Sequence, residues 1–358
     1  MSDPGAVGSS MRAAVYRGNG SLRVEQIPVP EIQPGELLVR VDACGICGTD
    51  VKKIERNLLP GPRVFGHETA GTVVRSGAGV RRFREGDRVA LHHHVPCGTC
   101  FYCREGLYSQ CPGYKRNGTT AGFEPAGGGF AEYVRVCEWI VERGVVPVPD
   151  GVSAAEASFV EPLNTCLKAV ERSRLQPGEV ALVVGQGPVG ALLMQLARWR
   201  GAQVITSDAL PDRLDLSRRL GAEVVVDARE DVVARVREWT GRGVDVAFLA
   251  ALGQAPLDQA IEATRPGGRV LVFAATSPGE RAEVDLGALC ASEKELLTSY
   301  SASIDVQDRA ARLIFDREIR VRELITHRFD LADAPRAVEL ASRPGNGVMK
   351  VMLTSERE

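Results

Sequence analysis

The sequence predicts an α/β protein with two domains, one rich in β-strands and one built on a doubly wound parallel sheet. At 358 residues the chain is too long for one ordinary hydrophobic core. The first 150 residues are dense in glycine and proline, with short valine-rich runs between turn signals, a barrel-like β pattern. From about residue 165, apolar strands alternate with longer amphipathic segments, which predicts a parallel sheet covered by helices.

Composition narrows the possible functions. The apolar fraction of 44% and the charged fraction of 25% are typical of a folded soluble protein. With 44 basic and 46 acidic residues the net charge is −2, and no basic run is present, so a nucleic-acid partner is not expected. No apolar run reaches about 18 residues, so we expect no membrane span. The start, "MSDPGAVGSS", lacks the features of a signal peptide, and a cytoplasmic location is the default expectation.

The predicted domains follow the change from short valine-rich runs to apolar strands that alternate with amphipathic segments. We expect a disordered leader over residues 1–10, a β-rich domain over 11–160 and a parallel-sheet domain over 161–296. Residues 297–358 are too few for a separate domain, so we expect them to complete the first one. In this tail the pattern predicts helices near 307–316 and 333–342, a strand in "LITHRFDLAD" and a last strand in "GVMKVMLT".

Four cysteines within fifteen residues predict a metal site. An unsecreted chain keeps its thiols reduced, which favours metal ligands over disulfides. Cys97, Cys100, Cys103 and Cys111 have the spacing C-x2-C-x2-C-x7-C, so one tight loop can present four thiolates to a tetrahedral ion. Four thiolates leave no position for substrate, which indicates a structural zinc. The spacing does not match that of a ferredoxin-like iron–sulfur cluster.

Three histidines precede this loop. If His92, His93 and His94 continue a strand, their side chains alternate in direction and cannot all converge on one metal. We therefore expect ordinary strand positions, with the alternative that one ring faces an active site.

A catalytic metal must find its ligands elsewhere. The candidate stretches are "CGICGTD" at 44–50, "GHE" at 66–68 and "EPL" at 161–163. One cysteine, one histidine and one or two carboxylates would give three protein ligands and an open position. A C-x-x-C redox pair is the weaker reading of the first stretch, because the thioredoxin-like context is absent. Spacing does not decide between Cys44 and Cys47.

A strand, a glycine turn and a helix predict dinucleotide binding in "EVALVVGQGPVGALLMQLAR". The turn has the G-x-G-x-x-G order, in which the glycines allow a tight turn, close approach of pyrophosphate and close helix packing. Asp208 follows the last glycine by 18 residues, at the end of the next strand, where an acid binds the ribose of NAD. Arg213 nearby leaves room for NADP. The predicted cofactor-binding residues are Gly185, Gly187, Pro188, Val189, Gly190, Asp208 and Arg213.

Together these motifs resemble the zinc-dependent medium-chain dehydrogenase/reductase superfamily, which includes alcohol, sorbitol and threonine dehydrogenases. The resemblance runs from about residue 11 to the C-terminus through "CGICGTD", "GHETAGTV", "EGDRV", the four-cysteine spacing, "GGGFAEYV", "EPL", "VVGQGPVG" and "RPGGRV". It implies a GroES-like catalytic domain, interrupted by a Rossmann NAD-binding domain and completed by the C-terminal segment, with the active site in the cleft between them. It also implies a homo-oligomer, with a tetramer favoured over a dimer.

The resemblance assigns a zinc ligand set. Cys47 matches the family's catalytic-zinc cysteine, which leaves Cys44 as strand packing, and His67 matches the histidine ligand. Glu68 and Glu161 match two glutamates that bind the zinc directly or stand just behind it, and which of them binds at rest stays open.

The resemblance also implies a proton relay. Thr49 matches the family's hydroxyl residue that passes the alcohol proton toward the nicotinamide ribose. Relatives end this relay in a histidine where this chain has Lys52. Either the lysine or water replaces that histidine, and a solvated surface lysine is an equal alternative.

The implied cofactors are NAD and two zinc ions per chain, one catalytic and one structural. The expected reaction is reversible hydride transfer between NAD and a secondary alcohol, polyol or cyclitol. The stretch "TSYSASIDVQD" has no arginine before Arg309, unlike animal sorbitol dehydrogenases, which argues against strict sorbitol specificity. The alternatives are a threonine-dehydrogenase-like oxidation of an amino alcohol and a non-catalytic nucleotide-binding protein.

Overall fold

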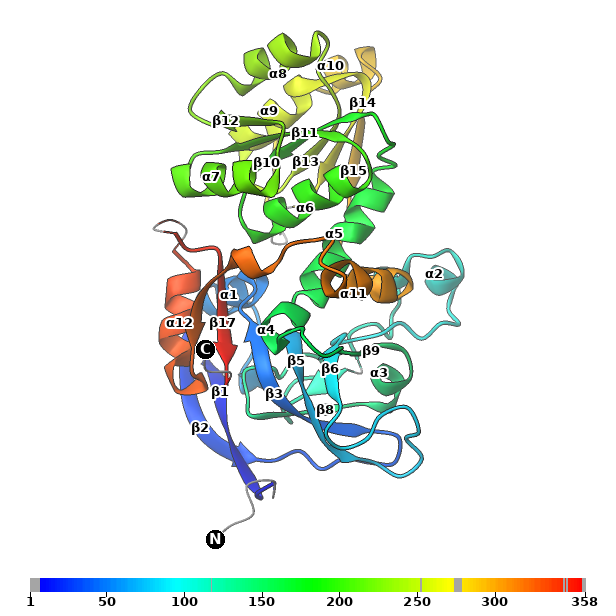
Figure 1. Cartoon of the computed structure of the whole chain (residues 1–358), viewed down its shortest axis with the longest axis vertical. Coiled ribbons are helices and arrows are strands. Elements are labelled where there is room, and N and C mark those ends of the chain that lie inside the picture. Colours follow the sequence, from blue (N-terminus) through cyan, green and yellow to red (C-terminus); the bar gives the residue numbers. More distant parts are fainter. Residues whose placement is uncertain are drawn as a thin grey trace.

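Two units lie along the long axis of the molecule, one on a parallel sheet and one on mostly antiparallel sheets (Figure 1). This computed structural model describes residues 7–116, 118–251, 253–273, 279–343, 345 and 347–355. The predicted α/β class with a β-rich unit and a Rossmann-type unit is confirmed. In the part of the chain that is described, no helix has the length and apolar character needed to cross a membrane.

The N-terminal unit contains most of the strands. They are β1 (Ser10–Gly18), β2 (Ser21–Pro28), β3 (Leu37–Gly45), β4 (Arg63–Val64), β5 (Glu68–Ser76), β6 (Arg88–Leu91), β7 (Thr119–Thr120), β8 (Tyr133–Val136) and β9 (Val145–Pro147). The helices in the same stretch are α1 (Gly48–Glu55), α2 (Phe101–Arg104), α3 (Glu138–Arg143), α4 (Ala154–Ala157) and α5 (Val160–Arg172). A three-stranded sheet has the order β2-β1-β4, and β3, β5, β6 and β9 lie in a larger sheet.

The parallel sheet has the order β12-β11-β10-β13-β14-β15, which is the strand order of a Rossmann fold. Its strands are β10 (Val180–Val184), β11 (Gln203–Asp208), β12 (Val224–Asp227), β13 (Val244–Leu249), β14 (Thr264–Val272) and β15 (Glu295–Thr298). Its helices are α6 (Pro188–Trp199), α7 (Pro211–Leu220), α8 (Val232–Thr240), α9 (Gln254–Ala263) and α10 (Leu286–Ala291).

Both faces of this sheet are buried. Ala181 and Val183 of β10 pack in one core cluster, whereas Leu182 and Val184 pack in another. Successive side chains of a strand point to opposite faces, so an uninterrupted apolar strand requires cover on both sides. The apolar runs predicted for these strands are therefore explained by the helices on either side of the sheet.

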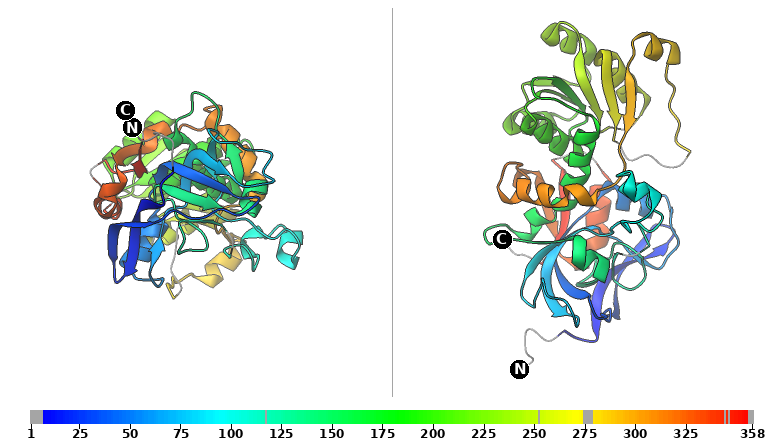
Figure 2. Two further views of the ribbon diagram at one scale, coloured as in Figure 1. Left: turned by 90° about the horizontal axis from the view of Figure 1, so that it is seen from below. Right: turned by 90° about the vertical axis from the view of Figure 1, so that its right-hand side faces the viewer.

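The end of the chain returns to the N-terminal unit. Its elements are α11 (Gln307–Phe315), β16 (Ile325–Phe329), α12 (Ala334–Ala341) and β17 (Lys350–Thr354). β17 pairs antiparallel with β3, with Met352 opposite Gly45 and Leu353 opposite Cys44. The eight-stranded sheet thus has the order β16-β17-β3-β5-β6-β9 with β7 and β8 beside it. Figure 2 shows the tail against the N-terminal unit from a second direction.

The predicted boundaries stay predictions. Of the expected leader, residues 1–6 lie outside the described residues, and β1 begins at Ser10. α5 begins at Val160, and β15 spans Glu295–Thr298, so the boundaries expected at 160/161 and 296/297 fall at or within single elements.

We predict that helix α5 holds the two units together. Leu163 is fully buried in a core cluster that contains Ala70 of the N-terminal unit and Leu193 of α6. Replacing Leu163 with alanine should lower the free energy of unfolding by about 2–5 kcal/mol because a cavity remains. Leu58→Ala, at a 45% exposed leucine, is the control and should change it by less than about 0.5 kcal/mol. Equal urea denaturation curves for the two variants would contradict this assignment.

Candidate active site and metal centres

The four predicted cysteines form one compact group. Their sulfur atoms lie within 4.8 Å of one another. The Sγ atoms of Cys100 and Cys103 are 3.5 Å apart, and the backbone N–H of Cys97 donates to Cys111 Sγ at 3.3 Å. All nine cysteines of the chain are free thiols. Four convergent sulfur donors fit a closed tetrahedral zinc site. The loop that carries them contains α2 and projects from the N-terminal unit (Figure 1).

A second group joins Cys47, His67 and Glu68, whose donor atoms also lie within 4.8 Å of one another. Cys47 is the N-cap of α1, and its Sγ accepts a hydrogen bond from the backbone N–H of Thr49 at 3.5 Å. Glu68 begins β5 and lies opposite Gly45 of β3, so strand pairing brings the two stretches together. Three protein donors fit a zinc site with an open fourth position.

The structure separates the roles of the two cysteines in "CGICGTD". Cys44 is fully buried in β3, and its Sγ lies 3.5 Å from Thr69 Oγ1. Burial raises the pKa of this thiol to about 12, so Cys44 stays protonated and packs in the core. A Cβ on Gly129 would lie 2.6 Å from Cys44 Sγ, and one on Gly66, which has a φ of +94°, would lie 2.9 Å from it. The glycines of "GHE" and "GGGF" therefore make room for this side chain.

Asp50 orients His67, and the sequence analysis missed this role. His67 Nδ1 lies 3.2 Å from Asp50 Oδ1, which leaves Nε2 for a metal. Burial alone would raise the pKa of Asp50, but the neighbouring His67 lowers it below its usual value. An ionised carboxylate behind the ring favours an N–H on Nδ1. The sequence signal was the aspartate of "GTD", three residues after Cys47.

Lys350 is the second residue that the sequence analysis missed. Its Nζ lies 2.7 Å and 2.6 Å from the two carboxylate oxygens of Glu68, and the residue is 4% exposed. Burial alone would lower the pKa of Lys350, but the Glu68 carboxylate raises it above its usual value. A Cβ on Gly45 would lie 2.0 Å from Glu68 Oε2. The glycine of β3 thus leaves space for a buried ion pair.

Glu161 stands beside the three-donor group but outside it. It lies in the first turn of α5, and its Oε1 is 3.9 Å from His93 Nδ1. Burial raises the pKa of Glu161 to about 7. Of the two glutamates left open by the sequence, Glu68 is the one within the donor group.

The expected strand over the three histidines is wrong. β6 ends at Leu91, and the chain bends at His93, so the side chains do not alternate. Instead the rings gather, with centroids 3.7 Å apart for His93 and His94 and 6.0 Å apart for His92 and His93. Burial lowers the pKa of His92 to about 4 and lowers those of the other two well below the usual value.

Lys52 is not a freely solvated side chain. Its Nζ lies 3.2 Å from Glu280 Oε1, and the side chain is 14% exposed. Arg56, the C-cap of α1, bonds the same oxygen at 2.7 Å. The role of Lys52 in proton release stays a prediction.

The glycine turn has the shape that a dinucleotide requires. Gly185 follows the end of β10 with a φ of +90°, and Gly187 caps α6, which begins at Pro188. A Cβ on Gly190 would lie 1.8 Å from the carbonyl oxygen of Gly185, so helix and strand pack as closely as predicted. Val189 packs against the core. The turn and helix N-terminus fit a pyrophosphate.

Asp208 and Arg213 lie beside this turn. Asp208 ends β11, and its Oδ2 accepts the backbone N–H of Gln186 at 2.6 Å. Arg213 Nη1 lies 3.5 Å from the same oxygen. A Cβ on Gly187 would meet only the Arg213 guanidinium, at 3.7 Å or more. The open side of the turn therefore faces a cation, which fits an anionic ligand.

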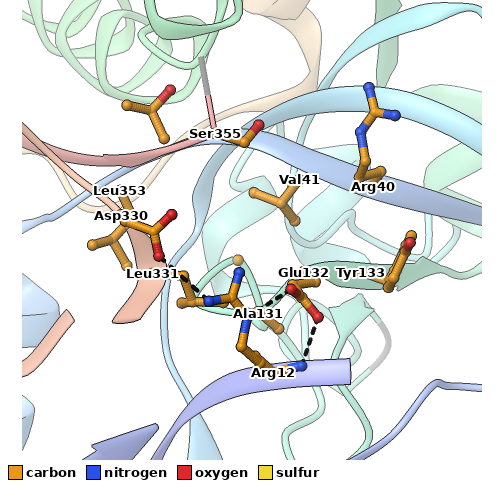
Figure 3. Close-up of a pocket in the computed structure, with 12 residues that line it drawn as sticks. Arg12, Arg40, Val41, Ala131, Glu132, Tyr133, Asp330, Leu331, Leu353 and Ser355 are labelled. Atoms are coloured by element: carbon orange, nitrogen blue, oxygen red, sulfur yellow. Dashed lines mark hydrogen bonds and ion pairs between the residues drawn. The ribbon is translucent and has the colours of Figure 1, made fainter. Parts of the chain in front are cut away.

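The pocket drawn in Figure 3 is not part of the candidate active site. It is lined by residues of β1, β3, the stretch 129–132, the start of β8 and the tail, and none of the predicted site residues lines it. Its Arg12 is held by Glu132, with Nε 2.8 Å from Oε1, and lies 3.6 Å from Asp330. Its charges are paired within the protein.

Comparison with known families gives two matches. Residues 33–150 match the Alcohol dehydrogenase GroES-like domain, and residues 188–316 match the Zinc-binding dehydrogenase family. These segments contain both metal-donor groups and the whole helix that follows the glycine turn.

Similar proteins match over nearly the whole chain. Sorbitol dehydrogenase of Bacillus subtilis (strain 168) is 31% identical, over 98% of this chain and 99% of its own. L-threonine 3-dehydrogenase of Rhizobium etli (strain CIAT 652) is 32% identical, over 96% and 99%. A candidate zinc-binding dehydrogenase of Sinorhizobium meliloti 1021, solved bound to NADP, has a TM-score of 0.86 at 31% identity, over 97% and 100%. The chain belongs to the zinc-type medium-chain dehydrogenase/reductase superfamily.

Proposed function

We propose that this protein is a zinc- and NAD-dependent dehydrogenase that converts a secondary alcohol, polyol or cyclitol to the ketone, reversibly. The observation that carries the proposal is the group of Cys47, His67 and Glu68, which offers three donors and an open position. Zinc at this group would make the hydroxyl proton easier to lose, and NAD would accept the hydride. The names of the sorbitol and threonine dehydrogenases support the same reaction class.

The chain's own residues would orient the ligands and carry the proton. Asp50 holds the His67 ring, and Lys350 holds the Glu68 carboxylate. Thr49, the second residue of α1, stands next to Cys47, where its hydroxyl would receive the alcohol proton. Lys52 lies one turn further along α1 but is paired with Glu280, so it or water would take the proton onward.

The proposal includes the zinc content, the location and the oligomeric state of the protein. We propose two zinc ions per chain, one at each donor group, because the four cysteines offer a closed site and the other group an open one. We also propose a cytoplasmic homo-oligomer, with a tetramer favoured over a dimer. The exposure of Leu286 in α10 and of Leu296 in the edge strand β15 supports association of chains.

Strict sorbitol specificity is not proposed. The stretch "TSYSASIDVQD", which stands directly before Arg309, contains no arginine. Arg309 itself bonds Glu171 of α5. An assay of the purified protein should therefore cover secondary alcohols, polyols, cyclitols and L-threonine, with NAD and with NADP. NAD-dependent turnover of hydroxyl substrates supports the proposal, and turnover of L-threonine alone would favour the amino-alcohol alternative.

The first prediction for this function concerns the two cysteines of "CGICGTD". Cys47→Ser should lose one zinc per chain and lower kcat/KM roughly a hundredfold or more, because the open site loses a ligand. Cys44→Ser, only three residues away, should keep both zinc ions and most of the activity. Cys103→Ser should lose the other zinc. Zinc content by atomic emission and the NADH absorbance assay measure these outcomes.

The opposite pattern would contradict the assignment. If Cys44→Ser lost zinc and activity while Cys47→Ser kept them, the ligand would be Cys44. If all three variants kept two zinc ions, neither donor group would be the metal site.

The second prediction concerns the buried ion pair. In protein freed of zinc, Lys350→Met should lower the free energy of unfolding by about 3–5 kcal/mol, because it leaves Glu68 buried without a partner. Adding Glu68→Gln to Lys350→Met should restore much of the loss. Lys53→Met, at a half-buried lysine of α1, is the control. Urea unfolding measures the differences, and equal stability of the two lysine variants would show that the pair does not carry this energy.

The third prediction concerns the choice of nucleotide. Asp208→Ala should lower kcat/KM for NAD by about tenfold or more and shift the preference toward NADP, because the acid binds the ribose and repels a 2′-phosphate. Asp227→Ala is the matched control, since Asp227 lies opposite Asp208 on the neighbouring strand. A ratio of NAD to NADP activity that both variants leave unchanged would remove Asp208 from the cofactor site.

A further inference from the structure

The three adjacent histidines form a cluster that the proposed mechanism does not use. Two of them contact residues outside the metal-donor group. His92 Nδ1 lies 3.0 Å from Gln307 Oε1. The ring centroids of His94 and Tyr114 lie 3.9 Å apart in an edge-to-face contact, and His94 Nε2 lies 3.5 Å from Ser301 Oγ. These two rings have structural partners on the inner side of the fold.

His93 is placed differently. Its ring centroid lies 4.9 Å from that of His67, a member of the three-donor group. Its Nδ1 lies 3.9 Å from Glu161 Oε1, and this nitrogen is buried without a hydrogen-bond partner. The side chain is 12% exposed. The ring therefore borders the site with one unsatisfied polar atom, and a small part of its surface is exposed.

The backbone fixes this position. The carbonyl oxygen of His93 accepts the backbone N–H of Thr119 at 3.1 Å. A Cβ on Gly118 would lie 2.2 Å from that oxygen, so the neighbouring chain packs closely against it. The backbone that carries the ring is therefore held in place, which lowers the cost of ordering it when a ligand binds.

The separation of His93 and Glu161 fits one bridging oxygen. At 3.9 Å the two atoms are too far apart to bond each other. An oxygen between them can lie about 2.8 Å from each, a normal hydrogen-bond distance. A hydroxyl group both donates and accepts, so it can satisfy an imidazole nitrogen and a carboxyl oxygen together.

We propose that His93 determines specificity by binding, together with Glu161, a second hydroxyl group of the substrate on the carbon next to the reacting one. The inference rests on the proposed function and narrows its substrate class to vicinal diols, including polyols and cyclitols. A simple alcohol leaves the pair without its oxygen, and sites with unpaired buried polar groups discriminate strongly against such analogues.

His93 does not act as a further metal ligand in this arrangement. The donor group within 4.8 Å contains Cys47, His67 and Glu68 among the described residues, and His93 lies outside it. Its replacement should therefore leave the zinc content unchanged, which separates a role in substrate binding from a role in holding the metal.

The test compares matched substrates on the zinc-loaded full chain. The pairs are 2-butanol with 2,3-butanediol, and cyclohexanol with 1,2-cyclohexanediol, each with saturating NAD. His93→Phe keeps a ring but removes both nitrogens, and His93→Gln keeps a donor and an acceptor. His92→Phe is the control, because it makes the same change at the neighbouring ring that faces Gln307. Zinc content and melting temperature are measured for every variant.

We expect His93→Phe to lower kcat/KM for the diols about tenfold to a hundredfold, the effect of one lost hydrogen bond, and to change that for the mono-alcohols by less than about threefold. His93→Gln should recover part of the diol activity. His92→Phe should not change the ratio of diol to mono-alcohol activity. Equal losses on both kinds of substrate, or a lowered zinc content in His93→Phe, would overturn the proposal.

Failure of the proposed function can be distinguished from failure of the proposed role of His93. If the wild-type protein turned over none of the alcohols, calorimetric titration of the zinc- and NAD-loaded protein with the two cyclohexane compounds would still test His93. Tighter binding of 1,2-cyclohexanediol that His93→Phe abolishes would support the role of His93 in binding. Equal binding of the two compounds to the wild-type protein would overturn it.

Discussion

The buried ion pair between Lys350 and Glu68 connects the last strand of the chain to the candidate active site. Both carboxylate oxygens of Glu68 bond to the lysine, and neither residue is more than 4% exposed. Breaking a buried pair by removing one partner leaves an uncompensated charge, so the two strands that carry them must stay together. The last strand, β17, therefore does more than complete the first unit. It also supplies Lys350 to the candidate active site.

This pairing places three strands side by side. β3 lies between β17 and β5, and Gly45 is opposite Met352 on one side and Glu68 on the other. Immediately after Gly45 the chain turns into α1, whose cap is Cys47. One cysteine, one histidine and one glutamate thus reach a common point because of strand register, whereas the four cysteines of the other group reach theirs within a single loop. The first group has three donors and leaves a fourth position open, whereas four thiolates fill every position of a tetrahedral ion.

Much of this arrangement was predictable from the sequence, because its signals are local. The glycine turn, the four-cysteine loop and the strands of the parallel sheet each occupy a short stretch with its own pattern. The roles of Lys350 and Asp50 were not predicted, because a single lysine in an apolar strand and a single aspartate in a turn carry no spacing signal. The histidines were misread for a related reason, since the bend at His93 depends on contacts with residues near 118 and 144.

The proposed chemistry requires zinc at both donor groups, with the open site at Cys47, His67 and Glu68. Anomalous diffraction at the zinc edge, from crystals of the purified chain, would locate the metal ions. We expect two peaks, one among the four cysteine sulfurs and one bonded to Cys47 and His67 at the ordinary distances of about 2.3 Å to sulfur and 2.0–2.1 Å to nitrogen. A single peak at the four cysteines, from protein that turns over alcohols with NAD, would contradict it.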